Sequence, residues 1–381
     1  IACIGALCGC TDRLGGDRIE EMPALNSLVA DVQGNMENVK PIGAEEYPVF
    51  YDHRQEGRSI RAMDAILENE PYPLRGLILT GANPILTNPN TDKVKRALKS
   101  LDLFVVRDLF MTDTARLADY VLPAASFLER SEVIRGGIPQ SISLTKKVLE
   151  FDSCQNEYQF WSCLAQKVGI GQYFPWKNED ELNRWIIKPL GVSLEELAQK
   201  PEGYIYKVYN YEKFYENGFD TPSGKVEFSS DYLGKHGYEK LPVYRPACYL
   251  SDKNKGQYKF ILITGARQAR FNNSCYHHIP RFKKAVPWPV MEIHPKDAAS
   301  LQVADGDLVE VTSATGSLKI RVSIVGQDKI QQGFLQITHG FDEVNVNRIT
   351  PDDILDPVSG FPAMKSVLVN VTKIPEDTKK N

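Results

Sequence analysis

The last third of the chain decides its fold. Residues 259–301 read KFILITGARQARFNNSCYHHIPRFKKAVPWPVMEIHPKDAASL, and residues 302–322 continue as QVADGDLVEVTSATGSLKIRV. A hydrophobic strand ends in the small-residue turn 264–267, and a loop rich in Asn, His and Arg follows it. A short helix, a tight turn at residues 305–307 and two strands joined at Gly316 complete the stretch. Turn residues that recur between strands at intervals of about ten residues predict a β-barrel.

The composition is that of an ordinary globular protein. The chain has 381 residues, 42% apolar and 25% charged, which is enough for two domains or more. The net charge of −4, with no basic domain, argues against a nucleic-acid partner. No run of about 18 apolar residues occurs, so no membrane span is expected. The N-terminus has no Met and no signal-peptide pattern, so we interpret the chain as a piece without its upstream part, and the compartment stays open.

The cysteines do not form a recognisable ligand set. Their number is odd and no C-x-x-C pair occurs, so neither a disulfide framework nor a complete iron–sulfur site is expected. Cys3, Cys8 and Cys10 fall in an expected helix over 1–18, and we interpret them as small buried residues rather than metal ligands. The others are Cys154, Cys163, Cys248 and Cys275.

The middle of the chain alternates short apolar strands with helices. Strands are expected at 74–80 (LRGLILT), 103–107 (LFVVR) and 121–122, with helices over 91–100 and 112–120 between them. This alternation predicts a parallel sheet with right-handed crossovers. Ligands of such sheets bind at the carboxyl ends of the strands. Further helices are expected at 59–69, 155–168 and 178–200, and a strand at the end of 218–228 (GFDTPSGKVEF).

Polar residues follow two of these strands. The Gly81-Ala82-Asn83-Pro84 turn leads into a helix, and exposed N–H groups at such a turn suit a pyrophosphate. Asp108 can accept two hydrogen bonds from the N1–H and N2–H₂ edge of guanine. An ordinary strand-to-helix turn and a helix-capping Asp remain the alternatives. No G-x-S-x-G, Walker A or G-x-G-x-x-G motif occurs, so no catalytic residue and no metal ligand are assigned.

The order of these motifs resembles one enzyme family. Asp108, the segment FMTDTARLADYVLPAASFLE (110–129), the GANP turn, GFDTPSGKVEF and the barrel together resemble the molybdopterin oxidoreductases, the dimethyl-sulfoxide-reductase-like enzymes. The resemblance covers nearly the whole chain. It implies an incomplete parallel-sheet α/β portion over residues 1–245. It also implies a molybdopterin-dinucleotide-binding barrel of the double-psi type over residues 246–381.

The resemblance also implies a cofactor and its contacts. Family members bind two molybdopterin guanine dinucleotides, whose dithiolenes hold molybdenum or tungsten. The [4Fe–4S] cluster and the metal ligand belong to an upstream half. The guanosine end would lie against the α/β portion and the pterins against the barrel. The implied contact residues are Gly81, Asn83, Pro84, Asp108, Thr112, Thr264, Gly265, Arg267, His277, Asn347 and Lys365.

Several of these residues have plainer interpretations. A guanidinium at Arg267 can pair with phosphate or the pterin ring, but a surface Arg is the alternative. His277 and the neighbouring His278 lack partners at zinc-like spacing. The amide of Asn347 suits a pterin or guanine edge, whereas Lys365 can equally be a solvated cation.

The function implied by the resemblance is that of a catalytic-subunit portion that performs oxygen-atom or electron transfer. A non-redox hydratase or transhydroxylase of the same family is an alternative, and a catalytically silent structural subunit is another. A small-molecule substrate and an iron–sulfur electron-transfer subunit are the expected partners.

Overall fold

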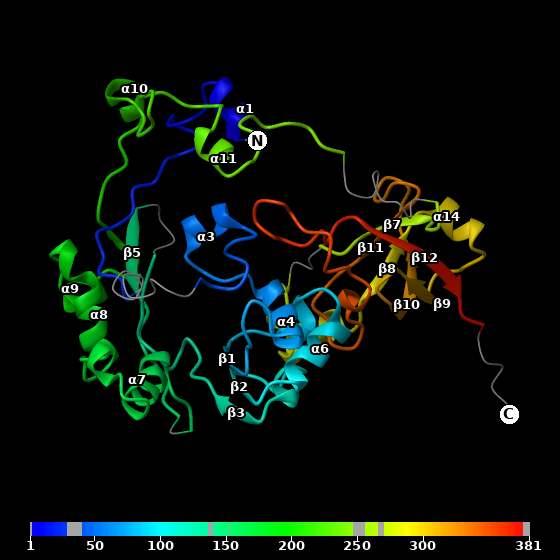
Figure 1. The fold of residues 1–381 in the computed structure, drawn as a ribbon, viewed down its shortest axis with the longest axis horizontal. Coiled ribbons are helices and arrows are strands. Elements are labelled where there is room, and N and C mark those ends of the chain that lie inside the picture. The colour runs from blue at the N-terminus through cyan, green and yellow to red at the C-terminus, as the bar shows by residue number, and fades with distance from the viewer. Residues whose placement is uncertain are drawn as a thin grey trace. The chain divides into compact units, whose positions relative to one another are not determined.

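The computed structural model describes residues 2–28, 40–135, 140–151, 153–246, 256–265 and 270–375. The chain divides into two compact units (Figure 1). The first unit comprises Ile1–Val39 with Pro123–Val243, and the second comprises Lys40–Leu122 with Tyr244–Asn381. The domain boundary predicted between residues 245 and 246 stays a prediction.

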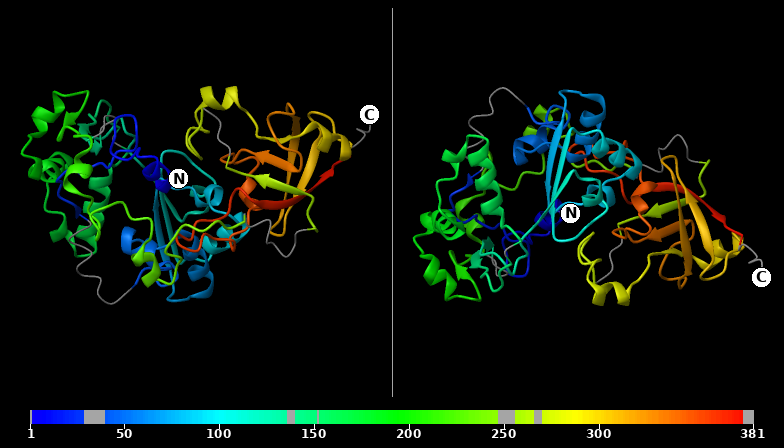
Figure 2. Two further views of the ribbon diagram at one scale, coloured as in Figure 1. Left: turned by 90° about the horizontal axis from the view of Figure 1, so that it is seen from above. Right: turned by 90° about the horizontal axis from the view of Figure 1, so that it is seen from below.

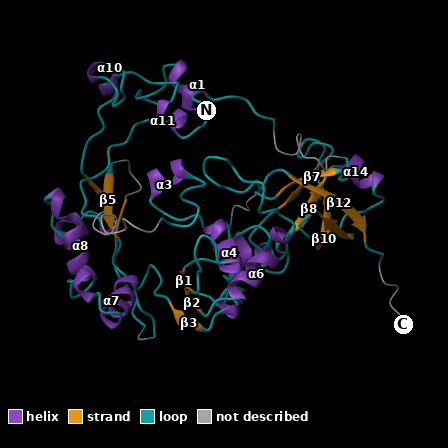
Figure 3. Ribbon diagram, in the orientation of Figure 1, coloured by secondary structure: helices purple, strands orange, loops and turns teal. Residues whose placement is uncertain are grey.

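The second unit contains the parallel sheet. Strands β1 (Gly76–Thr80), β2 (Leu103–Asp108) and β3 (Tyr120–Pro123) lie in the order β1-β2-β3. β1 and β2 are parallel, with Thr80 opposite Arg107, so their carboxyl ends meet at one edge. Helices α4 (Ser59–Glu68) and α6 (Thr91–Lys99) share an apolar core with these strands, which Figure 3 shows beside them. Burial of such side chains contributes roughly 1.5–3 kcal/mol each.

The barrel belongs to the same unit. Its six strands close in the order β10-β8-β11-β7-β12-β9, and the views of Figure 2 show them in yellow to red. The pairs β7–β11 and β8–β10 are parallel, and the remaining pairs are antiparallel. The strands are β7 (Phe260–Ile263), β8 (Val290–Ile293), β9 (Leu308–Thr312), β10 (Ser317–Ile324), β11 (Phe334–Ile337) and β12 (Val367–Lys373).

Alternation along the strands builds the barrel core. In β10 every second residue is buried, namely Leu318, Ile320 and Val322, while the residues between them face solvent or the rim. This period of two is what a sheet with one apolar face requires. The predicted fold class, a parallel-sheet α/β portion followed by a β-barrel, is therefore confirmed.

The first unit is mainly helical. A small core forms where α8 and α9 pack on the antiparallel sheet β4-β5-β6, around Ile142, Ile187 and Leu197. Its elements are α1 (Ala2–Leu7), β4 (Val133–Arg135), β5 (Ser141–Leu144), α7 (Glu157–Lys167), α8 (Glu179–Ile187), α9 (Leu194–Ala198), β6 (Tyr204–Ile205), α10 (Lys213–Asn217) and α11 (Asp231–Lys235). The second unit adds α3 (Pro48–Arg54), α5 (Pro84–Thr87), α13 (Pro280–Ala285) and α14 (Pro295–Ser300). Short 3₁₀ turns are η1 (Ala115–Leu117), η2 (Gly171–Tyr173), η3 (Lys188–Leu190) and η4 (Val346–Arg348).

Three predicted elements are wrong. The helix expected over 1–18 ends at Leu7, because Gly9 adopts a φ of +67°. The helix expected over 112–120 is only the η1 turn, and the segment 218–228 forms turns instead of ending in a strand. The interpretation of the first three cysteines as buried is also wrong, since Cys8 and Cys10 are exposed and Cys3 is half-buried.

The helices of the described residues are too short or too polar to cross a membrane. Among these residues, no helix combines the length and the apolar character that crossing a bilayer requires.

Candidate functional site

The turn after β1 lies against the end of β2. The Gly81 N–H donates to the carbonyl of Arg107 at 2.9 Å, which places the turn beside Asp108. Gly81 has a φ of +60°, and a Cβ on it would meet no atom within 4 Å. A backbone that is left-handed and open on this side can approach a ligand closely. Gly81 is therefore suitably placed for the predicted pyrophosphate contact.

Asn83 and Pro84 begin helix α5. The Asn83 Oδ1 accepts a hydrogen bond from the Thr114 hydroxyl at 2.6 Å, and the Thr114 Oγ1 in turn accepts the N–H of Ile85 at 3.2 Å. Asn83 is buried, and Pro84 occupies the first turn, where its missing N–H costs nothing. These contacts fix the turn and join it to the segment after β2.

Asp108 and Thr112 follow β2. Asp108 is half-buried, and its Oδ1 accepts the N–H of Phe110 at 3.2 Å. Thr112 is buried, and its Oγ1 accepts the N–H of Ala115, the first residue of the η1 turn, at 3.1 Å. Gly81, Asn83, Pro84, Asp108 and Thr112 thus lie at the carboxyl edge of the sheet, and we call them the strand-end group.

A second set of predicted residues lies at the end of β7. The Thr264 hydroxyl donates to the carbonyl of Met364 at 2.6 Å, and the Thr264 N–H donates to the same oxygen at 3.1 Å. A Cβ on Gly265 would lie 2.7 Å from the Lys365 Cε, so the lysine side chain crosses directly over the glycine. Arg267 lies outside the described residues.

His277 is packed close to this turn. Its Nε2 lies 3.0 Å from the Asn273 carbonyl, and its ring stacks on Phe271 at a centroid distance of 3.9 Å. Burial holds the pKa of His277 below its usual range, which keeps the ring neutral at pH 7. His339 joins the same network, with Nδ1 3.0 Å from the Thr264 carbonyl and Nε2 3.2 Å from the Asn273 Oδ1. We call Thr264, Gly265, His277 and Lys365 the barrel group.

Two asparagines link the barrel to the strand-end group. The Asn345 Nδ2 donates to the Ile85 carbonyl at 2.7 Å, and the Asn347 Nδ2 donates to the Leu86 carbonyl at 2.8 Å. Both asparagines are buried. A second link is the ring of Phe110, which stacks on His278 at 5.3 Å. The structure therefore brings the strand-end group and Asn347 together directly, and connects the barrel loop 271–279 to the end of β2 through Phe110.

Sequence reasoning missed several residues of this network. Thr114 and His339 hold the predicted residues in place, together with Asn273 of the polar loop that the sequence had indicated, and Phe110 stacks on His278 of the same loop. A lone Thr, Asn or His carries no spacing signal, so only the tertiary contacts show their roles. Asn345 was not missed, because the sequence places it two residues before Asn347 and its amide suits the same pterin or guanine edge.

A charged cluster lies beside the Phe110–His278 contact. The His278 Nε2 lies 3.2 Å from the Asp342 Oδ2, while the buried Asp342 Oδ1 accepts no hydrogen bond from the described residues. Burial raises the pKa of Asp342 above its usual range; His278 opposes this shift, whereas Asp113 and Glu343 add to it. The cluster therefore contains a carboxyl whose charged form is disfavoured by burial.

The raised pKa of Asp342 predicts a pH-dependent stability. The native state binds the Asp342 proton more tightly than the unfolded chain, so the free energy of unfolding falls as pH rises from about 4 through the raised value. Asp342→Asn removes this penalty and is expected to raise stability at pH 7, with a difference that shrinks toward pH 4. Urea unfolding at a series of pH values measures this.

Glu343→Gln is a control for which the opposite change in stability is expected. Burial acts to raise the pKa of Glu343, but Lys283 and a backbone hydrogen bond outweigh burial, so the net pKa is lowered. Glu343→Gln is therefore expected to lower stability at neutral pH and to have little effect below pH 4. The same sign of change in both variants would contradict the assignment.

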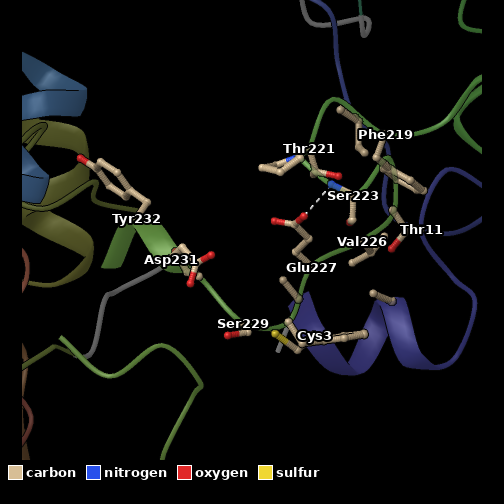
Figure 4. Close-up of a pocket in the computed structure, with 16 residues that line it drawn as sticks. Cys3, Thr11, Phe219, Thr221, Ser223, Val226, Glu227, Ser229, Asp231 and Tyr232 are labelled. Atoms are coloured by element: carbon tan, nitrogen blue, oxygen red, sulfur yellow. Dashed lines mark hydrogen bonds between the residues drawn. The ribbon is translucent and has the colours of Figure 1, made fainter. Parts of the chain in front are cut away.

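A separate cavity lies in the first unit. It has a volume of about 840 Å³ and is bounded by α1 and by residues 219–232 (Figure 4). Glu227 accepts the Ser223 N–H inside it at 2.9 Å. None of the predicted cofactor residues lines this cavity.

Comparison with known proteins decides the family. The molybdopterin oxidoreductase family model matches residues 25–151, and the Molydopterin dinucleotide binding domain model matches residues 260–368. The chain belongs to the molybdopterin oxidoreductase family. The match over residues 25–151 includes the parallel sheet and the strand-end group. The match over residues 260–368 includes most of the barrel and the barrel group.

Relatives of known name agree with this assignment. Acetylene hydratase of Syntrophotalea acetylenica is 34% identical over 78% of this chain and 40% of its own length. The F420-dependent formate dehydrogenase subunit alpha of Methanocaldococcus jannaschii is 30% identical over 79% of this chain and 43% of its own length. The solved structure of acetylene hydratase from Pelobacter acetylenicus matches with a TM-score of 0.82 and 28% identity, over 93% of this chain and 55% of that one. The chain thus spans about half the length of these relatives.

The residues present fit a molybdopterin dinucleotide. The Oδ1 of Asn347 is buried and accepts no hydrogen bond from the described residues, so it remains available to an amino group such as those on a pterin or guanine edge. The open face of Gly81 and the cation of Lys365 over Gly265 suit phosphate oxygens. The dinucleotide-binding domain supports a molybdopterin cofactor with molybdenum.

Proposed function

We propose that this chain is the cofactor-binding portion of the catalytic subunit of a molybdenum oxidoreductase. The observation that carries the proposal is the direct link between the segment 345–347 of the barrel unit and helix α5: Asn345 and Asn347 donate to the carbonyls of Ile85 and Leu86, just after the strand-end turn. A dinucleotide needs such an arrangement, because its base and its pterin must be held at the same time.

The proposal gives each group a task. The strand-end group binds the guanosine end, with the Asp108 carboxylate accepting from the N1–H and N2–H₂ of guanine. Thr264, Gly265, Asn347 and Lys365, together with Arg267, orient the pterin and neutralise phosphate charge. When bound, the metal centre supplies oxygen-atom or electron transfer; the protein holds, orients and shields it.

The finer composition of the holoenzyme is also proposed. We propose two molybdopterin guanine dinucleotides and one [4Fe–4S] cluster. The described residues contain no group of three or more His, Cys, Asp or Glu that could hold a metal ion, and the relatives are longer than this chain. The proposal therefore assigns the metal ligand and the cluster to polypeptide outside these 381 residues. It further proposes that residues 246–381 form a separate cofactor-binding domain.

The reaction is proposed to be redox, with a small-molecule substrate and an iron–sulfur electron-transfer partner. One similar protein is a formate dehydrogenase subunit by name, which supports this choice. The measurement is the content of Mo, W, Fe and released GMP in protein expressed from its complete gene. Folded protein that lacks Mo, W and GMP under conditions that load a relative would overturn the proposal.

Asp108→Ala is expected to reduce GMP retention about tenfold or more, because it removes two charge-assisted hydrogen bonds. Asp102→Ala is the matched control: Asp102 precedes the same strand, is exposed, and forms an ion pair with Arg75, which is worth little. GMP released per mole of protein after gel filtration is the measurement. Equal retention in the two variants would remove Asp108 from the site.

A further inference from the structure

A second cavity in the first unit is polar and contains a buried carboxylate. Its volume is about 380 Å³, which lies within the range of small-molecule sites. Its lining includes Glu129, Lys147, Glu150, Phe151, Cys154 and Gln159. We call it the Glu129 pocket. None of the residues predicted to bind the cofactor lines it.

Glu129 lines this pocket and is itself buried. The side chain is held by its own turn, since the Oε2 accepts the Ser126 N–H at 2.8 Å and the Glu129 N–H donates back to the Ser126 carbonyl at 3.0 Å. Only 8% of the residue is exposed. The Oε1 is buried and accepts no hydrogen bond from the described residues, although the Cys154 thiol is near enough to the carboxylate to lower its pKa. A buried acceptor without a donor is costly, so this oxygen favours a ligand that brings one.

The carboxylate is ionised at neutral pH. The backbone hydrogen bond from Ser126, helped by the Ser126 and Cys154 side chains, lowers the pKa of Glu129 below its usual range. A donor that reaches Oε1 therefore meets a negative charge, and a cationic donor gains most from this contact.

The surrounding charges also favour a cation. Lys147 is the ammonium at the pocket, and its nearest partner is Glu150, with Nζ 2.6 Å from Oε1. Glu150, Glu179 and Glu129 all raise the pKa of Lys147. Two carboxylates, Glu129 and Glu150, thus line the pocket with one lysine, which leaves a negative balance for a second positive charge.

The ring of Phe151 adds an apolar and π-rich wall. Phe151 lines the pocket, and 58% of the residue is exposed. Aromatic faces attract ammonium groups, and the ring also covers a short alkyl chain. The pocket therefore combines an anionic acceptor with a surface for a small apolar body.

We propose that the Glu129 pocket binds a small organic cation, a primary ammonium on a short alkyl chain, through the Oε1 of Glu129. The site is distinct from the proposed cofactor contacts, and it does not depend on the cofactor being bound.

The test is a calorimetric titration of the chain with n-propylammonium chloride at low ionic strength, where screening is weakest. The neutral analogue 1-propanol is the ligand control. Wild type is expected to bind propylammonium in preference to propanol, and Glu129→Gln is expected to weaken binding about tenfold or more. Glu150→Gln removes a carboxylate already paired with Lys147, and should change the affinity less than Glu129→Gln.

A second measurement needs no variant. Cys154 lines the pocket, so bound propylammonium is expected to slow its alkylation by iodoacetamide, whereas 1-propanol is not. Exposed Cys275, in the other unit, serves as the internal reference. Propylammonium that fails to bind wild type, binds Glu129→Gln equally well, or leaves the Cys154 rate unchanged overturns the proposal.

Discussion

Gly340→Ala is expected to destabilise the second unit by about 3 kcal/mol or more and to release the cofactor. Gly340 has a φ of +99°, and a Cβ on it would lie 2.4 Å from the Asn273 carbonyl and 2.8 Å from the His277 Nε2. The first of these atoms is backbone and cannot rotate away. The loop 271–279 must therefore move, and the hydrogen bonds that Asn273 makes to His277 and His339 move with it.

Gly333→Ala is the matched control. Gly333 also has a positive φ, +83°, but a Cβ on it would meet no atom within 4 Å. It should cost only the backbone strain, about 1 kcal/mol. Urea unfolding followed by circular dichroism measures both variants, and GMP released per mole of protein measures the cofactor. Similar losses in the two would show that steric conflict at Asn273 is unimportant.

The sheet and the barrel could be predicted because their signals are local. The apolar runs at 76–80 and 103–108 are short and rich in β-branched residues, and each is followed by turn residues. In β10 the period of two is readable directly from SLKIRVSI. Neither signal depends on which distant segment lies opposite.

The failed elements depend on tertiary contacts. Thr112 and Asp113 resemble a helix start, and the Thr112 Oγ1 does accept the N–H of Ala115, but the chain becomes extended at Ala118. The next residue, Asp119, accepts the N–H of Phe104 with its Oδ2 at 2.7 Å and also donates its own N–H to the Phe104 carbonyl at 2.8 Å. Pairing with β2 therefore prevails over local helix propensity. In the segment 218–228, the Thr221 hydroxyl donates to the Lys225 carbonyl at 2.6 Å and closes a turn where a strand was expected.

The site was predictable in its residue types more than in their contacts. Glycine and aspartate at strand ends have local signals, whereas Asn347 needs Leu86, which is 261 positions away along the chain. The same holds for His339 and Asn273, separated by 66 positions. One sequence alone does not indicate which distant residues are in contact. The hydrogen bonds that position the barrel group are therefore known only from the three-dimensional structure.

Asp12 supports the largest stability effect expected in the first unit. It is fully buried, and its Oδ1 accepts the Tyr209 hydroxyl at 2.6 Å while its Oδ2 accepts the Phe214 N–H at 3.0 Å. Its carbonyl accepts the N–H of Glu212 at 2.8 Å. Its φ of +59° lies in the left-handed region, which Asp and Asn tolerate better than Ala. The Asp12 side chain thus connects the turn after α1 to Tyr209 and Phe214, which lie 197 and 202 positions later in the chain.

Asp12→Ala is expected to lower the free energy of unfolding of this unit by about 3–5 kcal/mol. The change leaves the hydroxyl of half-buried Tyr209 and the N–H of half-buried Phe214 without their acceptor, and it places Ala in a left-handed conformation. Tyr209→Phe removes the hydrogen bond to Asp12 together with the one that the Tyr209 hydroxyl accepts from the Ile19 N–H at 3.0 Å, and should cost about 1–2 kcal/mol. Asp12→Asn, which keeps the backbone preference and one acceptor, should fall between them.

Tryptophan fluorescence during urea unfolding suits this test, because Trp161, Trp176 and Trp185 all lie in the first unit and only exposed Trp288 lies in the second. The double variant Asp12→Ala/Tyr209→Phe completes a thermodynamic cycle. Since the two groups share a hydrogen bond, the double variant should lose less stability than the sum of the single losses. Additive losses would mean that Asp12 acts through its backbone conformation and Phe214 alone, and that the contact with Tyr209 contributes nothing to holding the turn.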